Sequence, residues 1–208
     1  MRALRIAITG NIGSGKSYVC ALFKTLGIPV FDSDLEAKRL YYREDIQSRI
    51  VARIGAEAYL EDGQLNRPYL ASVLFSDPEA LSFVEQTLYP ALNAYFAEWA
   101  DRQTSPYVLY ESALIFEKGL KSLFDAVIVV TASESTRIRR VMARDHSTEE
   151  RVRSRMALQI SEAEKISGAD YLVFHDQDEE DAFLMEQVLA IHHSLVSGDI
   201  GRSESQEA

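Results

Sequence analysis

The stretch Gly10-Asn11-Ile12-Gly13-Ser14-Gly15-Lys16-Ser17 decides how the rest of the chain is interpreted. It follows an apolar run, residues 4–9, and precedes a segment with helical character. Its glycines let the backbone turn tightly and point several N–H groups into one concavity, which a side chain would block. The amino end of the following helix adds unpaired N–H groups and a partial positive charge. The stretch therefore predicts a phosphate-binding loop.

Two side chains at the end of this loop complete the predicted site. The ammonium group of Lys16 can reach the β- and γ-phosphates of a nucleotide, and the hydroxyl of Ser17 can bind Mg²⁺. A glycine-rich turn beside a lysine is the structural alternative, but the strand before and the helix after are the context that the motif requires. We expect the phosphates of a nucleotide to be bound by Asn11, Ile12, Gly13, Ser14, Gly15, Lys16 and Ser17.

The size and composition of the chain are those of a one-domain soluble protein. It has 208 residues, of which 47% are hydrophobic and 26% charged, as in ordinary globular proteins. No apolar run approaches the length of a membrane span, and no signal-peptide pattern begins the chain. The single cysteine, Cys20, cannot form an internal disulfide, so we expect a buried thiol and a cytoplasmic protein.

The charge is unevenly distributed along the chain. The net charge is −10, and residues 176–208 hold nine acidic residues and one arginine. Residues 136–155 hold seven arginines and three acidic residues. An acidic chain argues against a nucleic-acid partner, whereas a confined arginine cluster suits a phosphate-rich small ligand. We expect small-molecule partners, no nucleic acid, no membrane, and a monomer or small homo-oligomer.

Five short segments have the pattern of strands and alternate with helical segments. This alternation predicts an α/β protein, with helices on both faces of a parallel five-stranded sheet in the three-layer P-loop NTPase fold. We expect a single domain over residues 1–196 and a disordered tail over residues 197–208. The five predicted strands are residues 4–9, 29–31, 106–110, 126–131 and 171–174.

Residues 35–104 have helical character throughout and separate two parts of the predicted core, residues 1–34 and 105–196. A connection of this length exceeds what a single crossover between parallel strands needs. We therefore interpret it as a helical insert. Asp77 followed by Pro78 marks the start of a helix, and Pro90 predicts that this helix is kinked or divided.

The arginine cluster lies on two predicted helices that together resemble a lid, about residues 137–160. Ser133 is the predicted cap of the first helix, and a capping box in residues 147–150 begins the second, which we expect to run to Ser167 and stop at Gly168. A turn at residues 145–146 joins them. Arginines spaced along one helix face can close over a transferring phosphate and exclude water, while a solvated basic face is the alternative.

Acidic residues follow two predicted strands, at the sheet edge where open α/β proteins bind ligands. Asp32 and Asp34 follow the second strand, and Glu111 follows the third. One of the two aspartates is expected to cap the next helix. The other can then face the phosphate site, where a carboxylate beside a bound hydroxyl accepts its proton. Glu111 is a candidate for organising Mg²⁺.

Residues 4–34 closely resemble dephospho-CoA kinases. Those enzymes read Thr-Gly-Gly-Ile-Gly-Ser-Gly-Lys-Ser/Thr and then Gly-Val-Pro-Val-Ile-Asp-Ala-Asp. The similarity extends over about residues 1–175, and the later matches in this order are more specific than the loop, which many kinases share. The later matches are Leu65-Asn66-Arg67, Leu88-Tyr89-Pro90, Ala113-Leu114-Ile115-Phe116-Glu117, Arg140-Val141-Met142-Ala143-Arg144-Asp145 and Arg155 with Gln159.

The resemblance implies phosphoryl transfer from ATP to the ribose 3′-hydroxyl of dephospho-CoA, the last step of coenzyme A synthesis. Asp34 would be the general base, Lys16 and Ser17 the phosphate and Mg²⁺ ligands, and Arg140 and Arg144 the clamps on the transferring phosphates. Arg140 thus joins Asp34 and Lys16 as a catalytic candidate, and Arg144 joins the nucleotide-binding set. The implied acceptor contacts are Asp34, Arg67, Tyr89, Glu111 and Phe116.

The chain departs from the family pattern at several positions. Asn11 replaces a second glycine, Glu111 stands where aspartate is frequent, and Tyr89 replaces a frequent histidine. Phe174-His175 replaces a usual Asp-Asn, and His175 is expected in a surface loop. Glu162 and Lys165 also replace common arginines.

Two other functions fit the same motifs. One is a kinase for another nucleoside or nucleotide, which would share the loop and the lid but have a different acceptor pocket. The other is a nucleotide-binding regulator without turnover. The presence of Lys16, Ser17, Asp34 and the arginines together favours an enzyme. Motifs typical of guanine-specific switches are absent from the sequence.

Overall fold

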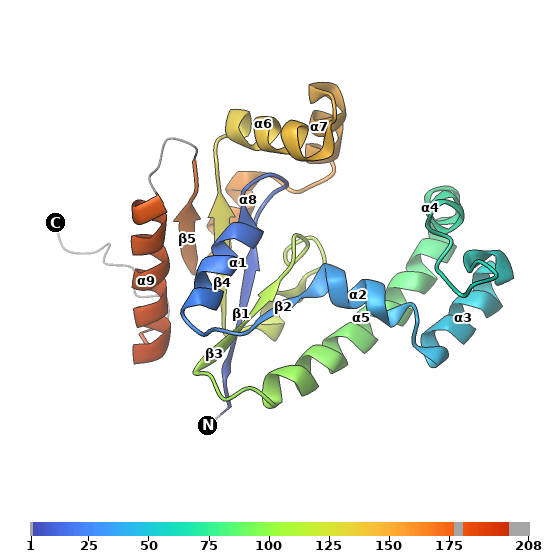
Figure 1. The fold of residues 1–208 in the computed structure, drawn as a ribbon, viewed down its shortest axis with the longest axis horizontal. Helices are drawn as coiled ribbons and strands as arrows, with labels where there is room; N and C mark the ends of the chain where they lie inside the picture. Colours follow the sequence, from blue (N-terminus) through green and yellow to red (C-terminus); the bar gives the residue numbers. More distant parts are fainter. Residues whose placement is uncertain (1, 177–180, 200–208) are drawn as a thin grey trace. The chain divides into compact units, whose positions relative to one another are not determined.

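The computed structural model describes residues 2–176 and 181–199 (Figure 1). Residues 200–208 of the expected tail lie outside the described residues. The chain divides into two compact units. The first unit holds the residues up to Phe31 and those from Gln103 onward, and the second is Asp32–Arg102. In the described part of the chain, no helix is both long and apolar enough to cross a bilayer.

The predicted parallel five-stranded sheet is confirmed, and its strand order is β2-β3-β1-β4-β5. β1 is the central strand and pairs in parallel with both β3 and β4, while β4 pairs in parallel with β5. This order brings the carboxyl ends of β1 and β3 together, with Ile8 opposite Glu111. The strands are β1 (Leu4–Thr9), β2 (Val30–Asp32), β3 (Tyr107–Glu111), β4 (Ala126–Thr131) and β5 (Tyr171–Phe174).

Helices cover both faces of the sheet in the first unit. α1 (Lys16–Thr25) and α9 (Asp181–Ser197) lie on one face (Figure 1) and form the main core with the strand residues that point toward them. Cys20 is in this core, as expected, and is 1% exposed. On the other face lies α8 (Glu162–Ser167), which contacts β4. The short helix η2 (Leu120–Leu123) comes directly before β4 in the chain. The side chains of consecutive strand residues point to opposite faces of the sheet, so each strand packs against the helices on both faces.

A helical hairpin stands over the carboxyl ends of β1 and β4 (Figure 1). It consists of α6 (Glu134–Asp145) and α7 (Glu149–Met156). The hydroxyl of Ser133 accepts a hydrogen bond from the N–H of Thr136 and caps α6, as predicted. His146 takes a left-handed conformation, with φ at 49°, at the predicted turn.

The prediction that one helix runs from residue 148 to Ser167 was wrong. α7 ends at Met156, and α8 begins separately at Glu162. The cause is a second capping box: the Ser161 hydroxyl accepts from the N–H of Glu164, and the Glu164 carboxylate accepts from the N–H of Ser161. This pair favours a new helix start. The segment between the two helices is free to run past the phosphate loop.

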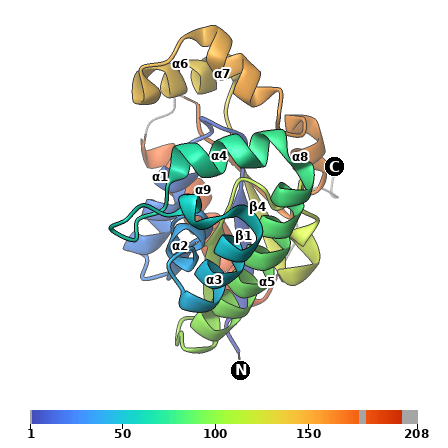
Figure 2. The same ribbon diagram turned by 90° about the vertical axis from the view of Figure 1, so that its right-hand side faces the viewer.

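The second unit is helical, apart from an isolated antiparallel bridge between Tyr59 and Leu65. The helices α2, α3 and α4 each pack against α5 (Figure 2). Asp77 caps α5, as predicted. Pro90 does not divide this helix, because Pro90 and Gln86 are both exposed and water can reach the carbonyl left without its helical donor. The elements are α2 (Ser33–Leu40), α3 (Glu44–Ile54), η1 (Ala56–Ala58), α4 (Arg67–Ser76) and α5 (Pro78–Asp101).

Candidate active site

The loop between β1 and α1 has positive φ angles, which favour glycine, at Gly10, Gly13 and Gly15. Gly13 has φ at 82°, and a Cβ atom there would lie 2.6 Å from the backbone oxygen of Arg137. Gly15 has φ at 90°, and its Cβ would lie 2.2 Å from Nδ1 of His175. The N–H of Ser14 closes a turn onto the oxygen of Asn11 at 3.1 Å. The glycines therefore permit both the curvature of the loop and its close packing.

A cavity of about 290 Å³ opens between this loop and helix α6. It lies at the amino end of α1, where unpaired N–H groups and the helix dipole favour an anion. Three cationic side chains line it, those of Lys16, Arg140 and Arg144. Ser17 and Tyr18 complete the wall on the side of α1. Its charge and position suit the phosphates of a nucleotide.

The hydroxyl of Ser17 donates a hydrogen bond of 2.6 Å to Oε1 of Glu111. Glu111 is the last residue of β3, so the strand order delivers its carboxylate to the start of α1. A hydroxyl and a carboxylate side by side are the hard oxygen donors that Mg²⁺ prefers. Mg²⁺ sites in proteins that bind nucleotides use one or two protein ligands together with the phosphates. The residues present therefore fit this ion.

Arg140 points toward the phosphate loop. Its Nη1 donates to the backbone oxygen of His175 at 2.9 Å and lies 3.4 Å from that of Ser14. Burial lowers the pKa of the Arg140 guanidinium. Arg144 is exposed and forms a two-point ion pair with Asp145, with its Nε 2.7 Å from Oδ1. Arg155 pairs with the same carboxylate, and the two arginines hold the pKa of Asp145 well below its usual range.

His175 lies in a loop directly after β5, as the sequence predicted, but its side chain packs against the phosphate loop. The side chain is half-buried, and its ring stacks on Tyr18 with the centroids 5.3 Å apart. It fills the space next to Gly15 that a side chain would need. Burial, followed by the charge of Arg140, lowers the pKa of His175. The ring is therefore a packing partner of the loop, a role that sequence position alone does not reveal.

Three of the predicted site residues belong to the second unit. Asp32 is the cap of α2, because its Oδ1 accepts from the N–H of Leu35 at 2.9 Å. Asp34 is therefore the aspartate whose carboxylate is not used as the cap, and it lies exposed in the first turn of α2. Arg67 is exposed at the first position of α4, and Tyr89 is half-buried on α5.

Phe116, the remaining predicted acceptor contact, lies in the first unit. Its ring packs against Gly168 so closely that a Cβ there would lie 2.5 Å from Cε1. Gly168 follows α8, where the sequence predicted a helix stop. The observed contact of Phe116 is therefore with the residue that ends α8 in the first unit.

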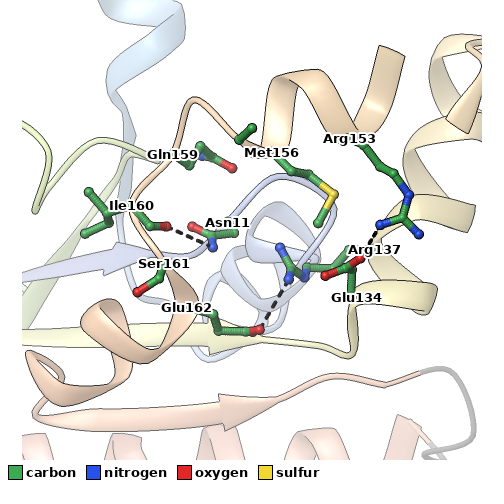
Figure 3. Close-up of a pocket in the computed structure, with 10 residues that line it drawn as sticks. Asn11, Glu134, Arg137, Arg153, Met156, Gln159, Ile160, Ser161 and Glu162 are labelled. Atoms are coloured by element: carbon green, nitrogen blue, oxygen red, sulfur yellow. Dashed lines mark hydrogen bonds and ion pairs between the residues drawn. The ribbon is translucent and has the colours of Figure 1, made fainter. Parts of the chain in front are cut away.

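Sequence reasoning missed the side chain of Gln159 as part of the loop structure. Its Oε1 accepts a hydrogen bond of 2.8 Å from the N–H of Ile12. Next to it, Nδ2 of Asn11 donates to the oxygen of Ile160 at 3.4 Å (Figure 3). The only signal in the sequence was the joint match of Arg155 and Gln159 to the family pattern, which gave no partner for either residue.

Comparison with known proteins places this site in a family. The family model described as dephospho-CoA kinase matches residues 4–181. The dephospho-CoA kinase of Syntrophotalea carbinolica is 37% identical over 203 residues, covering 94% of this chain and 93% of the relative. That of Porphyromonas gingivalis is 40% identical over 174 residues, covering 83% and 86%.

Solved structures agree with the fold. The crystal structure of TT1252 from Thermus thermophilus superimposes with a TM-score of 0.83 and 35% identity, covering 93% of this chain and 98% of that one. Dephospho-CoA kinase from Campylobacter jejuni gives a TM-score of 0.70 at 21% identity and shows the same fold, with coverages of 94% and 98%. With the phosphate loop and its arginines, these matches establish that the chain belongs to the dephospho-CoA kinase family.

Proposed function

We propose that this protein transfers the γ-phosphoryl group of ATP to the ribose 3′-hydroxyl of dephospho-CoA and so produces coenzyme A. The observation that carries the proposal is the cationic cavity at the amino end of α1, in a chain whose family match spans residues 4–181. In the reaction, the 3′-oxygen forms a bond to the γ-phosphorus, and the bond from that phosphorus to the oxygen retained by ADP breaks. The hydroxyl proton passes to a carboxylate of the enzyme.

The phosphate loop positions the transferring group. The N–H groups of residues 13–17 cradle the β-phosphate, and Lys16 neutralises charge on the β- and γ-phosphates. Ser17 and Glu111 would hold Mg²⁺, and the ion would neutralise charge on the phosphate oxygens. The 2.6 Å contact between these two side chains supports this assignment. Phosphoryl transfer needs mainly positioning and charge stabilisation, and the cavity offers both.

Asp34 is the proposed general base. The capping position is already taken by Asp32, so the carboxylate of Asp34 is left for the acceptor hydroxyl. Its exposure is compatible with this role, because catalytic contacts of this kind tighten when substrates bind.

Arg140 and Arg144 are the proposed clamps on the transferring phosphates. Both line the cavity, and each has a partner in the protein: backbone oxygens for Arg140 and the carboxylate of Asp145 for Arg144. Nucleotide binding would give Arg140 phosphate oxygens, which attract a guanidinium group more strongly than neutral carbonyls do. Arg144 could turn to the phosphates because Asp145 would remain paired with Arg155. We infer that α6 and α7 act as a lid in this exchange, within residues 137–160.

Arg67 and Tyr89, which belong to the proposed insert of residues 35–104, and Phe116, which belongs to the first unit, are proposed to hold the acceptor. Arg67 and Tyr89 lie on two helices of the second unit, and Arg67 is exposed. An exposed guanidinium can pair with the diphosphate of dephospho-CoA in a two-point contact. We further infer that the reaction occurs in the cytoplasm, which accords with a free and buried Cys20.

A pair of asparagine variants tests the assignment of the base. Asp34→Asn should reduce turnover with dephospho-CoA by about 10²–10⁴-fold while ADP still binds. Asp32→Asn is the matched control, because asparagine caps a helix as well as aspartate does. It should retain most of the turnover. Near-normal turnover in Asp34→Asn, or the larger loss in Asp32→Asn, would contradict the assignment.

A further inference from the structure

The phosphate loop is built from residues that leave its backbone free to change shape. Gly10, Gly13 and Gly15 all have positive φ, a region that glycine enters and leaves at little cost. Inside the loop, the N–H of Ser14 bonds to the oxygen of Asn11. A loop that must present several N–H groups to one phosphate therefore depends on contacts from outside to hold its shape.

Those contacts come from the chain around the helical hairpin, and they include the hydrogen bond from Nδ2 of Asn11 to the oxygen of Ile160. Arg140 reaches the oxygens of Gly13 and Ser14. Gln159, three residues beyond the end of α7, accepts the N–H of Ile12 at 2.8 Å. Arg140 is already assigned to the phosphates, so it must change partners when nucleotide binds, whereas Gln159 has no such second role.

The segment that carries Gln159 is itself anchored to the sheet. Glu162, at the start of α8, accepts a hydrogen bond from the hydroxyl of Thr131 on β4. The same carboxylate pairs with the buried guanidinium of Arg137 at 3.3 Å (Figure 3). Arg137 in turn donates from Nε to the oxygen of Ala132 at 3.1 Å. The segment that follows Gln159 is therefore held in place, and the side chain of Gln159 extends from it to the loop.

We propose that Gln159 is a positioning residue for phosphate transfer. Its carboxamide fixes the peptide of Ile12, and through it the orientation of the loop N–H groups that receive the phosphates. Gln159 touches no substrate in this account; it acts through the loop. The role rests on the proposed function for its kinetic consequence, but its structural consequence can be measured without an acceptor.

If Gln159 had a purely structural role, loss of its carboxamide would destabilise the whole fold. The side chain of Ile12 packs independently into a small apolar cluster between α6 and α7, formed by Ile138, Val141, Val152 and Met156. This packing does not need the hydrogen bond, so the protein should still fold when the carboxamide is lost. A cavity of about 410 Å³, lined by Asn11 and Gln159 among others, gives the released loop room to move (Figure 3).

The test is Gln159→Met, which keeps the length of the side chain and removes the carboxamide. Gln86→Met is the matched control, since Gln86 is exposed on α5 and its amide bonds to the hydroxyl of Ser82. The readouts are amide hydrogen exchange at Ile12, ADP affinity by calorimetry, kinetic constants with ATP, and the melting temperature. Exchange and ADP affinity need no acceptor, so they remain decisive if dephospho-CoA proves not to be the substrate.

We expect exchange at Ile12 to become about tenfold faster in Gln159→Met, the effect of losing one hydrogen bond. ADP affinity and kcat/KM for ATP should fall by about three- to thirtyfold, with a melting temperature close to that of Gln86→Met. Gln159→Glu retains an acceptor atom and should restore slow exchange at Ile12. Unchanged exchange would overturn the proposal. So would faster exchange with normal nucleotide affinity and turnover, or a loss of activity matched by general unfolding.

Discussion

The hydroxyl of Ser17 lies 2.6 Å from Oε1 of Glu111, although the two residues are 94 positions apart in the sequence. The contact exists because β3 is the neighbour of β1 and ends where α1 begins.

If this pair holds Mg²⁺, Glu111→Gln should raise the Mg²⁺ concentration needed for half-maximal turnover and lower kcat by about tenfold or more, because a neutral amide attracts the ion less. Glu111→Asp should retain more activity. A Mg²⁺ titration of each variant checks this, and an unchanged Mg²⁺ requirement in Glu111→Gln would remove Glu111 from the site.

Gly13 and Gly63 have nearly equal φ angles but different surroundings. Substituting each by alanine therefore distinguishes the effect of backbone strain from that of steric crowding. Gly13 has φ at 82° and a backbone oxygen 2.6 Å from the position of a Cβ, whereas Gly63 has φ at 78° and open space. Gly63→Ala should cost about 1–2 kcal/mol of stability from strain alone. Gly13→Ala should in addition displace the loop from α6 and weaken ADP binding by more than about tenfold. Calorimetric titration and thermal melts of both variants give the comparison, and normal ADP affinity in Gly13→Ala would contradict the described loop.

His175 should make stability depend on pH. Because burial lowers its pKa, the folded protein keeps the ring neutral while the unfolded chain binds a proton near its ordinary pKa of about 6.5. The contribution of His175 to the free energy of unfolding is therefore fully present above about pH 6.5. It decreases as the pH falls toward the lower pKa of the folded state. His175→Asn should lose less melting temperature than the parent between pH 7.5 and pH 5.5. The burial of His192, whose pKa is also lowered, leaves a residual dependence in both proteins. An equal loss in parent and variant would argue against the packing of His175.

The ion pair between Lys165 and Glu117 should matter more to stability than pairs on the surface. Its atoms are 2.7 Å apart, and the side chain of Lys165 is 1% exposed. Glu117→Gln should cost about 3–5 kcal/mol, since it leaves a buried ammonium without its counter-charge. The exposed pair of Arg102 and Glu98 is the control, and Glu98→Gln should cost less than about 1 kcal/mol. Chemical denaturation measures both, and similar costs would contradict the burial of Lys165.

The sequence was most informative where the signals are local. Helix caps at Ser133 and Asp77 and the strands of the sheet could be predicted because each depends on neighbouring residues. The break between α7 and α8 also depends on a local signal, the capping box of Ser161 and Glu164, which the prediction of one continuous helix did not include.

The contacts that complete the site could not be predicted in this way. Gln159 and Ile12 are 147 residues apart, and no spacing rule links a carboxamide to a particular loop N–H. The packing of His175 could not be predicted, because its contact with Gly15 depends on the position of β5 beside β4. Asp32 and Asp34 could both have capped α2 on sequence grounds, and only the hydrogen bond to Leu35 decides between them.

The central claim is tested most directly by measuring ADP formation from Mg·ATP by the purified protein, with dephospho-CoA or with a panel of nucleosides and nucleotides as acceptor. We expect fast turnover that depends on dephospho-CoA and yields a product that comigrates with coenzyme A. Turnover only with another acceptor would contradict the proposed substrate while leaving the phosphate site in place. Tight ATP binding without turnover on any acceptor would contradict the enzymatic function itself.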